Sequence, residues 1–271
     1  MSPRNEGDAP SPVPILLYHA IADDTAGPSA PWVISPREFA EHLDALAATG
    51  CQPVTVSRLV AEMSSPDPRP DPGTIAITFD DGFADFASGA LPALAERGWP
   101  ATLYVTTGAI GATTTWLPER RPMLSWSALR DVAGAGIEIG AHTVHHPQLD
   151  VLPLDRARRE IVESRATLED GLGAPVETFA YPHGYHDQRV RRLVVDAGFR
   201  SGCAVRHWFS SAHDDRFALS RVMVREGDSA ERVARWCRGE GLPTSAGGSS
   251  PIRSVAWRQV RRARARLGRA A

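Results

Sequence analysis

Two adjacent carboxylates stand directly after an apolar segment in the first third of the chain. Residues 75–79 alternate between large apolar and small or β-branched side chains, which is typical of a buried strand. Asp80 and Asp81 follow at once, before Gly82. An Asp-Gly pair between strands also favours a hairpin turn, so two interpretations are open. At the mouth of a buried strand, paired acids would serve acid–base or metal chemistry.

Three histidines within five residues form a second cluster, in the sequence EIGAHTVHHPQL. His142 and His146 are four residues apart, a spacing at which two imidazoles can converge on one metal ion. His145 then either points away from the ion or contacts one of the residues that bind it. A single histidine is more often structural, but three in one short loop favour metal binding.

A third ligand can come from Asp80 or Asp81, which completes a set of two imidazoles and one carboxylate. One carboxylate would bind the metal ion, and its neighbour would stay free to accept a proton from water. A bound metal ion lowers the pKa of such a water to about 7, so a carboxylate can assist near neutral pH. The residues therefore predict metal-assisted hydrolysis.

The order and spacing of TFDDG, HTVHH and FAYPHG resemble the polysaccharide deacetylases, the NodB-type domain of carbohydrate esterase family four. The resemblance extends from about Pro14 to Val224. PILLYHAI and ALSRVMVREGDS are similar to segments of the branch that acts on poly-N-acetylglucosamine. The resemblance implies a distorted (β/α) barrel with seven strands and one divalent metal ion, most often zinc, with cobalt or nickel also functional. The reaction that it implies is hydrolysis of an acetyl group.

The resemblance also implies roles for single residues. Asp80 is the implied catalytic base, and the implied metal ligands are Asp81, His142 and His146. In the third motif, His183 stands where the family has a tyrosine whose backbone N–H helps to bind the oxyanion, so His183 is the second catalytic candidate. The candidates for substrate binding are Tyr181, Pro182, His19 and Trp116, with Trp126 and Trp208 as further tryptophans that could stack on sugar rings.

Two departures from the family pattern bear on the mechanism. Ala180 stands where many members carry an arginine that orients the base, so we expect Asp80 to lack that partner. The last motif usually holds a histidine as general acid, whereas here it reads Leu-Ser-Arg at 219–221. Arg221 cannot release a proton near neutral pH. The candidates to replace this acid are His183, His207 and His213.

The elements that must position these motifs alternate along the chain. Strands are predicted at 13–18, 53–56, 75–79, 101–106, 137–139, 179–181, 202–205 and 219–224, and the predicted helix caps are Ser35, Ser57, Ser125, Asp187 and Ser229. About seven strand–helix repeats demand a parallel sheet covered by helices, either a closed barrel or an open doubly wound sheet. No GxGxxG motif supports a dinucleotide fold. We therefore expect an α/β fold, a distorted (β/α) barrel with about seven parallel strands, whose polar strand ends meet.

Composition excludes several function classes. The 271 residues carry a net charge of -2 and contain no lysine, which excludes a lysine Schiff base and a P-loop lysine. Cys51, Cys203 and Cys237 are widely spaced and form no CxxC motif, so a thiolate metal site is not expected. No specific nucleic acid partner is expected from the overall charge.

We expect a disordered leader at 1–12, a catalytic domain at 13–239, a Gly/Ser linker at 240–251 and an Arg-rich tail at 252–271. The tail contains seven arginines and no acid, so it could contact an anionic membrane surface, bind nucleic acid or have no partner. The leader has no apolar segment typical of a secretion signal. This predicts a cytoplasmic enzyme, peripheral at the membrane if the tail binds lipid.

Three functions fit these observations. The first is a metal-dependent deacetylase acting on an N- or O-acetylated glycan or glycan precursor, and the missing histidine slightly favours an ester. The second is an inactive deacetylase scaffold that binds glycans, although its four intact polar site residues argue against it. The third is an amidohydrolase of the same fold acting on a small non-sugar amide. A loop at 107–122 that closes the mouth would favour a small substrate, and an open groove a polymer.

Overall fold

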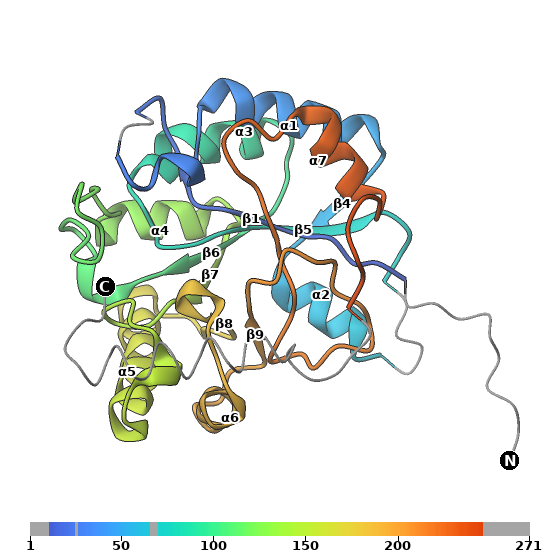
Figure 1. Cartoon of the computed structure of the whole chain (residues 1–271). Coiled ribbons are helices and arrows are strands. Elements are labelled where there is room, and N and C mark those ends of the chain that lie inside the picture. The colour runs from blue at the N-terminus through green and yellow to red at the C-terminus, as the bar shows by residue number, and fades with distance from the viewer. Residues whose placement is uncertain (1–10, 25–26, 66–69, 246–271) are drawn as a thin grey trace, which may run out of the picture.

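Parallel strands alternate with helices throughout residues 11–24, 27–65 and 70–245, the part of the chain that the computed structural model describes (Figure 1). The strands are β1 (Ile15–Tyr18), β2 (Ala20–Ile21), β3 (Val33–Ile34), β4 (Gln52–Val54), β5 (Thr74–Phe79), β6 (Thr102–Val105), β7 (Glu138–Ala141), β8 (Thr178–Ala180), β9 (Ser201–Cys203) and β10 (Val222–Met223). The α-helices are α1 (Pro36–Ala48), α2 (Val56–Met63), α3 (Leu91–Glu96), α4 (Trp126–Gly134), α5 (Leu154–Leu172), α6 (Gln188–Asp196) and α7 (Ala230–Cys237). The shorter helical segments are η1 (Ala30–Trp32), η2 (Phe86–Ala90), η3 (Thr107–Ala109), η4 (Leu149–Val151) and η5 (Pro182–Gly184).

Seven strands of the main sheet follow one another in the order β10-β1-β5-β6-β7-β8-β9, and β4 pairs with the first half of β5. The paired strands are parallel. The edge strands β9 and β10 are linked through Leu219, which bridges to Cys203 and accepts the N–H of Ala204 at 2.8 Å. This incompletely closed sheet confirms the predicted distorted (β/α) barrel with about seven parallel strands.

The parallel pairing of β5 and β6 shows that the hairpin interpretation of the Asp-Gly pair is wrong, because a two-residue turn joins only antiparallel strands. The N–H of Gly82 donates to the carbonyl of Asp80 at 3.0 Å, and the carbonyl of Asp81 accepts the N–H of Thr106 at 3.0 Å. The two acids thus form a tight turn at the carboxyl end of β5.

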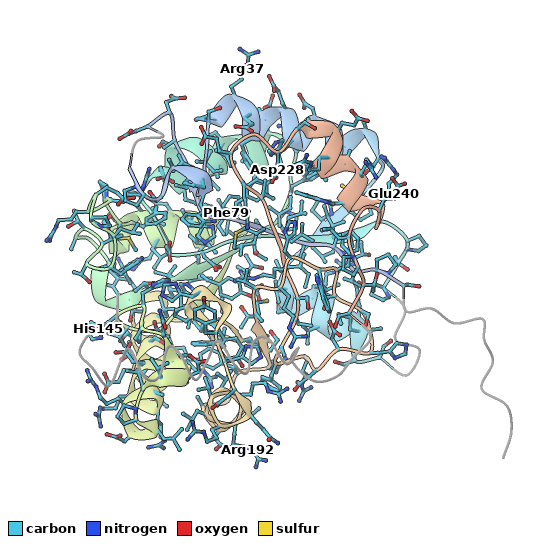
Figure 2. The ribbon with its side chains drawn as sticks, in the orientation of Figure 1. Arg37, Phe79, His145, Arg192, Asp228 and Glu240 are labelled. Atoms are coloured by element: carbon cyan, nitrogen blue, oxygen red, sulfur yellow. The ribbon has the colours of Figure 1, made fainter. Side chains whose placement is uncertain are left out.

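Strand β5 is buried along its whole length, as expected for a central strand that is covered on both faces. Phe79, its last residue, lies in the middle of the molecule (Figure 2). Its ring packs against Tyr18, Phe39 and Phe86, with ring centroids 5.5, 5.7 and 4.9 Å apart. Burying each ring contributes roughly 1.5–3 kcal/mol. This packing fixes the end of β5 and therefore the position of Asp80.

Helices cover both faces of the sheet: α1, α3 and α7 lie on one side, and α5 and α6 on the other (Figure 1). Four predicted N-caps are confirmed, because the side chains of Ser35, Ser125, Asp187 and Ser229 each accept a backbone N–H of the first turn. The predicted cap Ser57 is wrong. Thr55 accepts the N–H of Arg58 at 3.3 Å, so α2 begins before Ser57.

The polar strand ends meet at one end of the sheet. The register pairs Tyr18 with Phe79, so His19 and Asp80 leave neighbouring strands side by side. His142 follows β7 and donates its N–H to the carbonyl of Val105 at 3.0 Å. Strand β8 ends at Ala180, within the third motif and three residues before His183. The topology therefore brings the three sequence motifs together.

The expected tail at 252–271 lies outside the described residues, as do positions 1–10 of the leader and 246–251 of the linker. Phe209 donates its N–H to Pro243 and accepts the N–H of Ser245, so the fold continues into the expected linker. None of the helices in the described residues combines the length and the apolar character that crossing a membrane requires.

Candidate active site and metal centre

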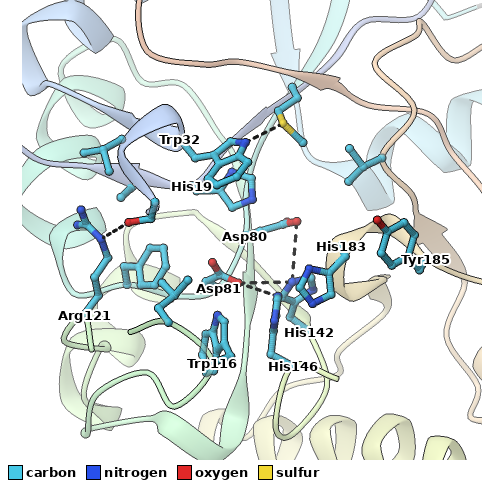
Figure 3. A pocket seen from close by; sticks show the side chains of 17 residues that line it. His19, Trp32, Asp80, Asp81, Trp116, Arg121, His142, His146, His183 and Tyr185 are labelled. Atoms are coloured by element: carbon cyan, nitrogen blue, oxygen red, sulfur yellow. Dashed lines mark hydrogen bonds and ion pairs between the residues drawn. The ribbon is translucent and has the colours of Figure 1, made fainter. Parts of the chain in front are cut away.

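A cavity of about 430 Å³ lies at the carboxyl ends of β1, β5, β7 and β8 (Figure 3). Its wall combines carboxylate, imidazole, guanidinium and aromatic side chains. The lining residues that carry these groups are His19, Trp32, Asp80, Asp81, Phe83, Trp116, Arg121, His142, His146, His183 and Tyr185. The pair of acids thus shares one cavity with two histidines of the cluster, His142 and His146.

Three side chains converge as a candidate metal centre. Ligand atoms of Asp81, His142 and His146 all lie within 4.8 Å of one another. Oδ1 of Asp81 is 3.2 Å from Nε2 of His146 and 3.6 Å from Nε2 of His142. Two ligand atoms held by one tetrahedral zinc ion, each at about 2.0–2.1 Å, lie about 3.4 Å apart. The donor set and its spacing therefore fit a divalent metal ion.

The polar atoms of this centre are in states that can bind a cation. Oδ1 of Asp81 is buried and has no hydrogen-bond partner among the described residues. Nδ1 of His142 donates to the carbonyl of Ala180 at 2.8 Å, which leaves the lone pair of Nε2 for the side of Asp81. Burial lowers the pKa of His142 to about 4, so this ring is neutral at neutral pH. Neutral imidazole with a fixed tautomer is the form that binds metal ions.

Backbone strain is concentrated at the same place. The φ angle is 75° at Asp81, 60° at His146 and 57° at His183, and Thr143 between the two histidines has φ 68°. These left-handed conformations cost non-glycine residues roughly 1–2 kcal/mol each. Strain of this kind is typical of functional sites, where the surrounding structure enforces it.

Asp80 lies beside the three converging ligands, with its Oδ2 3.9 Å from Nε2 of His142, and a buried arginine binds it. Arg221 donates to both carboxylate oxygens of Asp80, from Nη1 to Oδ1 at 2.7 Å and from Nη2 to Oδ2 at 2.7 Å. Its Nε donates to the carbonyl of Ala204 at 3.0 Å, and its guanidinium lies 5.5 Å from the ring centroid of Tyr104. The expectation that Asp80 lacks an arginine partner, because Ala180 replaces one, is therefore wrong. The segment that leads into β10 supplies the arginine instead.

Both neighbouring acids are ionised in this environment. Burial raises the pKa of Asp80, but the guanidinium of Arg221 and the imidazole of His142 outweigh burial and hold that pKa below its ordinary value. Burial also raises the pKa of Asp81, and the imidazoles of His146, His19 and His142 together outweigh it, so the pKa of Asp81 is lowered as well. Arg221 thus acts on Asp80 and His146 on Asp81, while His142 acts on both.

Two rings pack against the imidazole of His146. Trp116 stacks on it with centroids 4.9 Å apart and 21° between the planes, and His183 meets it edge-on at 4.6 Å. Tyr185 stacks on His183 at 5.9 Å. These rings restrict the orientation of His146 and form the aromatic wall of the cavity.

The structure separates the predicted substrate contacts into two groups. His19 and Trp116 line the cavity, whereas Tyr181 and Pro182 are buried and do not. The hydroxyl of Tyr181 donates to the carbonyl of Phe217 at 2.9 Å, inside the fold. Contact of Tyr181 and Pro182 with a substrate stays a prediction. Their observed place is between β8 and His183.

Two of the three proposed replacements for the general acid lie outside the cavity. His207 packs edge-on against Trp236 at 5.6 Å, and neither it nor His213 is part of the lining. The structure adds His19, which sequence reasoning assigned only to substrate binding. Nδ1 of His19 is buried and has no hydrogen-bond partner among the described residues. The further tryptophans Trp126 and Trp208 also lie outside the lining.

The loop at 107–122 closes one side of the cavity by binding the segment at 27–34. Glu119 accepts the N–H of Ser29 at 3.0 Å, and Nε of Arg121 donates to Oγ of Ser29 at 3.2 Å. Trp32, in the bound segment, is 36% exposed and lines the mouth. The length of the loop indicated a functional role, but nothing in the sequence indicated that Trp32 lines the cavity.

Comparison with known proteins agrees with this geometry. A sequence profile of the family described as polysaccharide deacetylase matches residues 67–202, half of the chain. The YxkH protein of Bacillus subtilis (strain 168) is 27% identical over 222 residues, which cover 82% of this chain and 75% of that protein. A chitooligosaccharide deacetylase of Sinorhizobium fredii (strain NBRC 101917 / NGR234) is 29% identical over 143 residues, 52% of this chain and 59% of that protein.

Solved structures share the fold. IcaB from Ammonifex degensii is 25% identical, with a TM-score of 0.72 over 84% of this chain and 97% of that one. The Streptococcus pyogenes deacetylase PplD, in complex with acetate, is 23% identical, with a TM-score of 0.73 over 84% of this chain and 98% of that one. At this identity, the likeness to PplD supports the fold alone.

Proposed function

The chain belongs to the polysaccharide deacetylase family, and we propose that it is a metal-dependent deacetylase that removes acetyl groups from a glycan or a glycan precursor. The proposal rests on one observation above all. The ligand atoms of Asp81, His142 and His146 converge in one cavity, which also contains the carboxylate of Asp80, bound by Arg221. The similarity to a chitooligosaccharide deacetylase supports an acetylated carbohydrate as the substrate.

We propose that Asp81, His142 and His146 hold the metal ion, most simply zinc, with cobalt or nickel as alternatives. When bound, such an ion polarises the acetyl carbonyl and makes water acidic enough to act as a nucleophile near neutral pH. The hydrogen bond of His142 to Ala180 keeps Nε2 unprotonated for this purpose. The ring of Trp116 restricts the orientation of His146.

Asp80 is the proposed general base. It takes a proton from the attacking water, and it can do so because it lies beside the ligands without being one of them. Arg221 keeps the carboxylate ionised and fixes its plane through two hydrogen bonds. A base within reach of the nucleophile and of defined orientation contributes about 10²–10⁴-fold to the rate.

His19 is the proposed proton donor to the leaving nitrogen or oxygen. Its imidazole lines the cavity. Burial lowers the pKa of His19, and the charges of Asp81 and Asp80 act against burial by favouring the protonated ring. His183 also lines the cavity, and its backbone N–H would donate to the carbonyl oxygen of the substrate. An amide needs the proton donor more than an ester does, because an amine anion is the poorer leaving group. The role of His19 therefore gives the amide nitrogen more weight than the sequence did.

A small non-sugar amide is the second candidate substrate, and the closed side of the cavity favours it. The contacts between Glu119, Arg121 and Ser29 seal that side, and a volume of about 430 Å³ lies in the range of small-molecule pockets. The mouth beside Trp32 still admits one acetylated sugar residue of a longer chain. Polymer and monomer substrates in the same assay separate the two candidates.

The test measures acetate release by the zinc-, cobalt- and nickel-loaded protein. The substrates are N-acetylglucosamine, its oligomers, an O-acetylated glycan and a simple acetamide, and Asp80→Asn is assayed beside the wild type. We expect acetate from at least one sugar, and at least a hundredfold slower release by the variant with zinc still bound. Release from the acetamide alone would support the small-amide candidate, and no release from any substrate would support the glycan-binding scaffold. Equal release by both proteins would remove Asp80 from the mechanism.

A further inference from the structure

Glu160, in the first half of α5, binds the loop between the two proposed histidine ligands. Its Oε2 accepts the N–H of Val144 at 3.0 Å and the N–H of His145 at 2.9 Å, and its Oε1 lies 2.8 Å from Nδ1 of His145. The side chain of Glu160 is 14% exposed, whereas that of His145 is 68% exposed. His145 lies at the surface of the molecule, away from the cavity (Figure 2). It therefore serves the loop and not the proposed ion.

The opposite side of the same loop is held by backbone groups. The carbonyl of Thr143 accepts the N–H of Thr107 at 3.1 Å, and the carbonyl of Val144 accepts the N–H of Gly108 at 2.8 Å. A Cβ at position 108 would lie 2.6 Å from that carbonyl oxygen, so the two segments are in close contact. The carbonyl groups of the loop thus bind η3, and its N–H groups bind Glu160.

The loop needs such support because its backbone is strained. Thr143 and His146 have φ angles of 68° and 60°, in the left-handed region that β-branched residues in particular avoid. Oγ1 of Thr143 accepts the N–H of His146 at 3.0 Å, which couples the two strained residues. If Glu160 were absent, the N–H groups of Val144 and His145 would lose their acceptor. The loop could then relax and move the imidazoles apart.

We propose that Glu160 is a positioning residue of the metal centre. It holds the strained loop so that His142 and His146 converge before an ion binds, and it thereby sets the affinity for the metal. The inference rests on the proposed function only in assuming that Asp81, His142 and His146 bind a divalent ion. Groups that orient ligands in this way change metal affinity by about 10–100-fold when they are removed.

The test is a calorimetric titration of the metal-free protein with zinc. We expect Glu160→Ala to raise the zinc Kd by about 10–100-fold. Glu160→Gln should stay within about threefold of the wild type, because its amide oxygen still accepts the two N–H groups and its NH₂ group can donate to His145. The matched control is Glu163→Ala, which removes an exposed carboxylate from the same helix and should leave the Kd unchanged.

Two further readouts separate positioning from general stability. The visible spectrum of the cobalt-loaded protein should change in Glu160→Ala and not in Glu160→Gln, because it reports the arrangement of the ligands. A purely structural role would lower the melting temperature of metal-free and loaded protein equally and leave the Kd alone. If Glu160→Ala does not fold, Glu160→Asp retains the charge but is too short to reach both N–H groups, and it should bind zinc more weakly than Glu160→Gln.

The outcomes distinguish this inference from the proposed function. Suppose that the wild type binds zinc and that the zinc Kd of Glu160→Ala, or of Glu160→Asp in its place, lies within threefold of the wild-type value. The inference is then wrong, and the metal site stands. If the wild type binds no zinc, cobalt or nickel, the metal-dependent function fails and the inference fails with it.

Discussion

Arg221 donates to both carboxylate oxygens of Asp80, each at 2.7 Å, in the interior of the barrel. This pair explains how two adjacent acids come to differ. Both oxygens of Asp80 are engaged by the guanidinium, whereas Oδ1 of Asp81 has no hydrogen-bond partner among the described residues. Asp81 is consequently the carboxylate that is available to a cation, and Asp80 is the one that is left to accept a proton.

Removing the arginine should therefore affect both stability and catalysis. Arg221→Met leaves Asp80 buried without its partner, which typically costs about 3–5 kcal/mol. The pKa of Asp80 should rise, so that activity falls and its acid limb moves to higher pH. Urea unfolding and the pH profile of kcat/KM measure the two effects. In the double variant Arg221→Met with Asp80→Asn, much of the stability should return, and a purely additive loss would contradict the pairing.

Zinc should stabilise the protein through Asp81 and not through Asp80. At a zinc concentration 100 times the Kd, binding contributes about 2.7 kcal/mol. For a chain of this size, this corresponds to a rise in melting temperature of about 5–10 °C. Chelation should reverse the rise. Asp81→Asn should lose most of the zinc-induced rise in melting temperature, and the neighbouring variant Asp80→Asn should keep it. The reverse pattern would make Asp80 the metal ligand and Asp81 the base.

The assignment of the proton donor predicts a difference between substrates. His19→Gln should slow hydrolysis of an N-acetyl group by about 10²–10⁴-fold, the usual contribution of a general acid. An O-acetyl group should suffer less because its leaving oxygen needs the proton less. His183→Ala keeps the backbone N–H and should cost less than tenfold on either substrate. Equal losses in both variants on both substrates would argue against His19 as the acid.

The pH dependence of stability should reveal the buried His142. Its pKa is lowered from an ordinary value of 6.5 to about 4, so on acidification the unfolded chain takes up this proton before the folded one. Its contribution is complete above pH 6.5 and is lost as the pH falls toward 4, by up to about 1.4 kcal/mol per pH unit. Urea unfolding of the metal-free protein between pH 7.5 and 4.5 tests this. The curve should be steeper than that of His142→Gln, and parallel curves would contradict it.

The sequence predicted the fold well because local patterns and burial agree in it. Residues 75–79 are buried on both faces, as a central strand covered on both sides must be. Ser35, Ser125, Asp187 and Ser229 cap the helices that they precede. Ser57 failed as a cap because Thr55, two residues earlier, is equally able to accept the N–H groups of the first turn. Where several polar residues near the start of a helix can each serve as the N-cap, the sequence alone does not determine which residue begins the helix.

The partner of Asp80 was missed because the family pattern directed attention to Ala180. A physical signal was present, however. Arg221 lies within a segment that was predicted to be a strand, and an arginine that is buried there requires an acceptor of opposite charge. Asp80, at the end of another strand, was such an acceptor. Only the order of strands places β10 beside β1 and β1 beside β5, and that order cannot be read from the sequence.

The central claim is that Asp81, His142 and His146 hold one ion while Asp80 remains unbound. Anomalous diffraction at the zinc absorption edge, on crystals grown with zinc, tests it most directly. The account predicts one strong peak at about 2.0–2.2 Å from Oδ1 of Asp81, Nε2 of His142 and a ring nitrogen of His146, with Asp80 still paired to Arg221. A peak coordinated by Asp80, or no peak in this cavity, would contradict it.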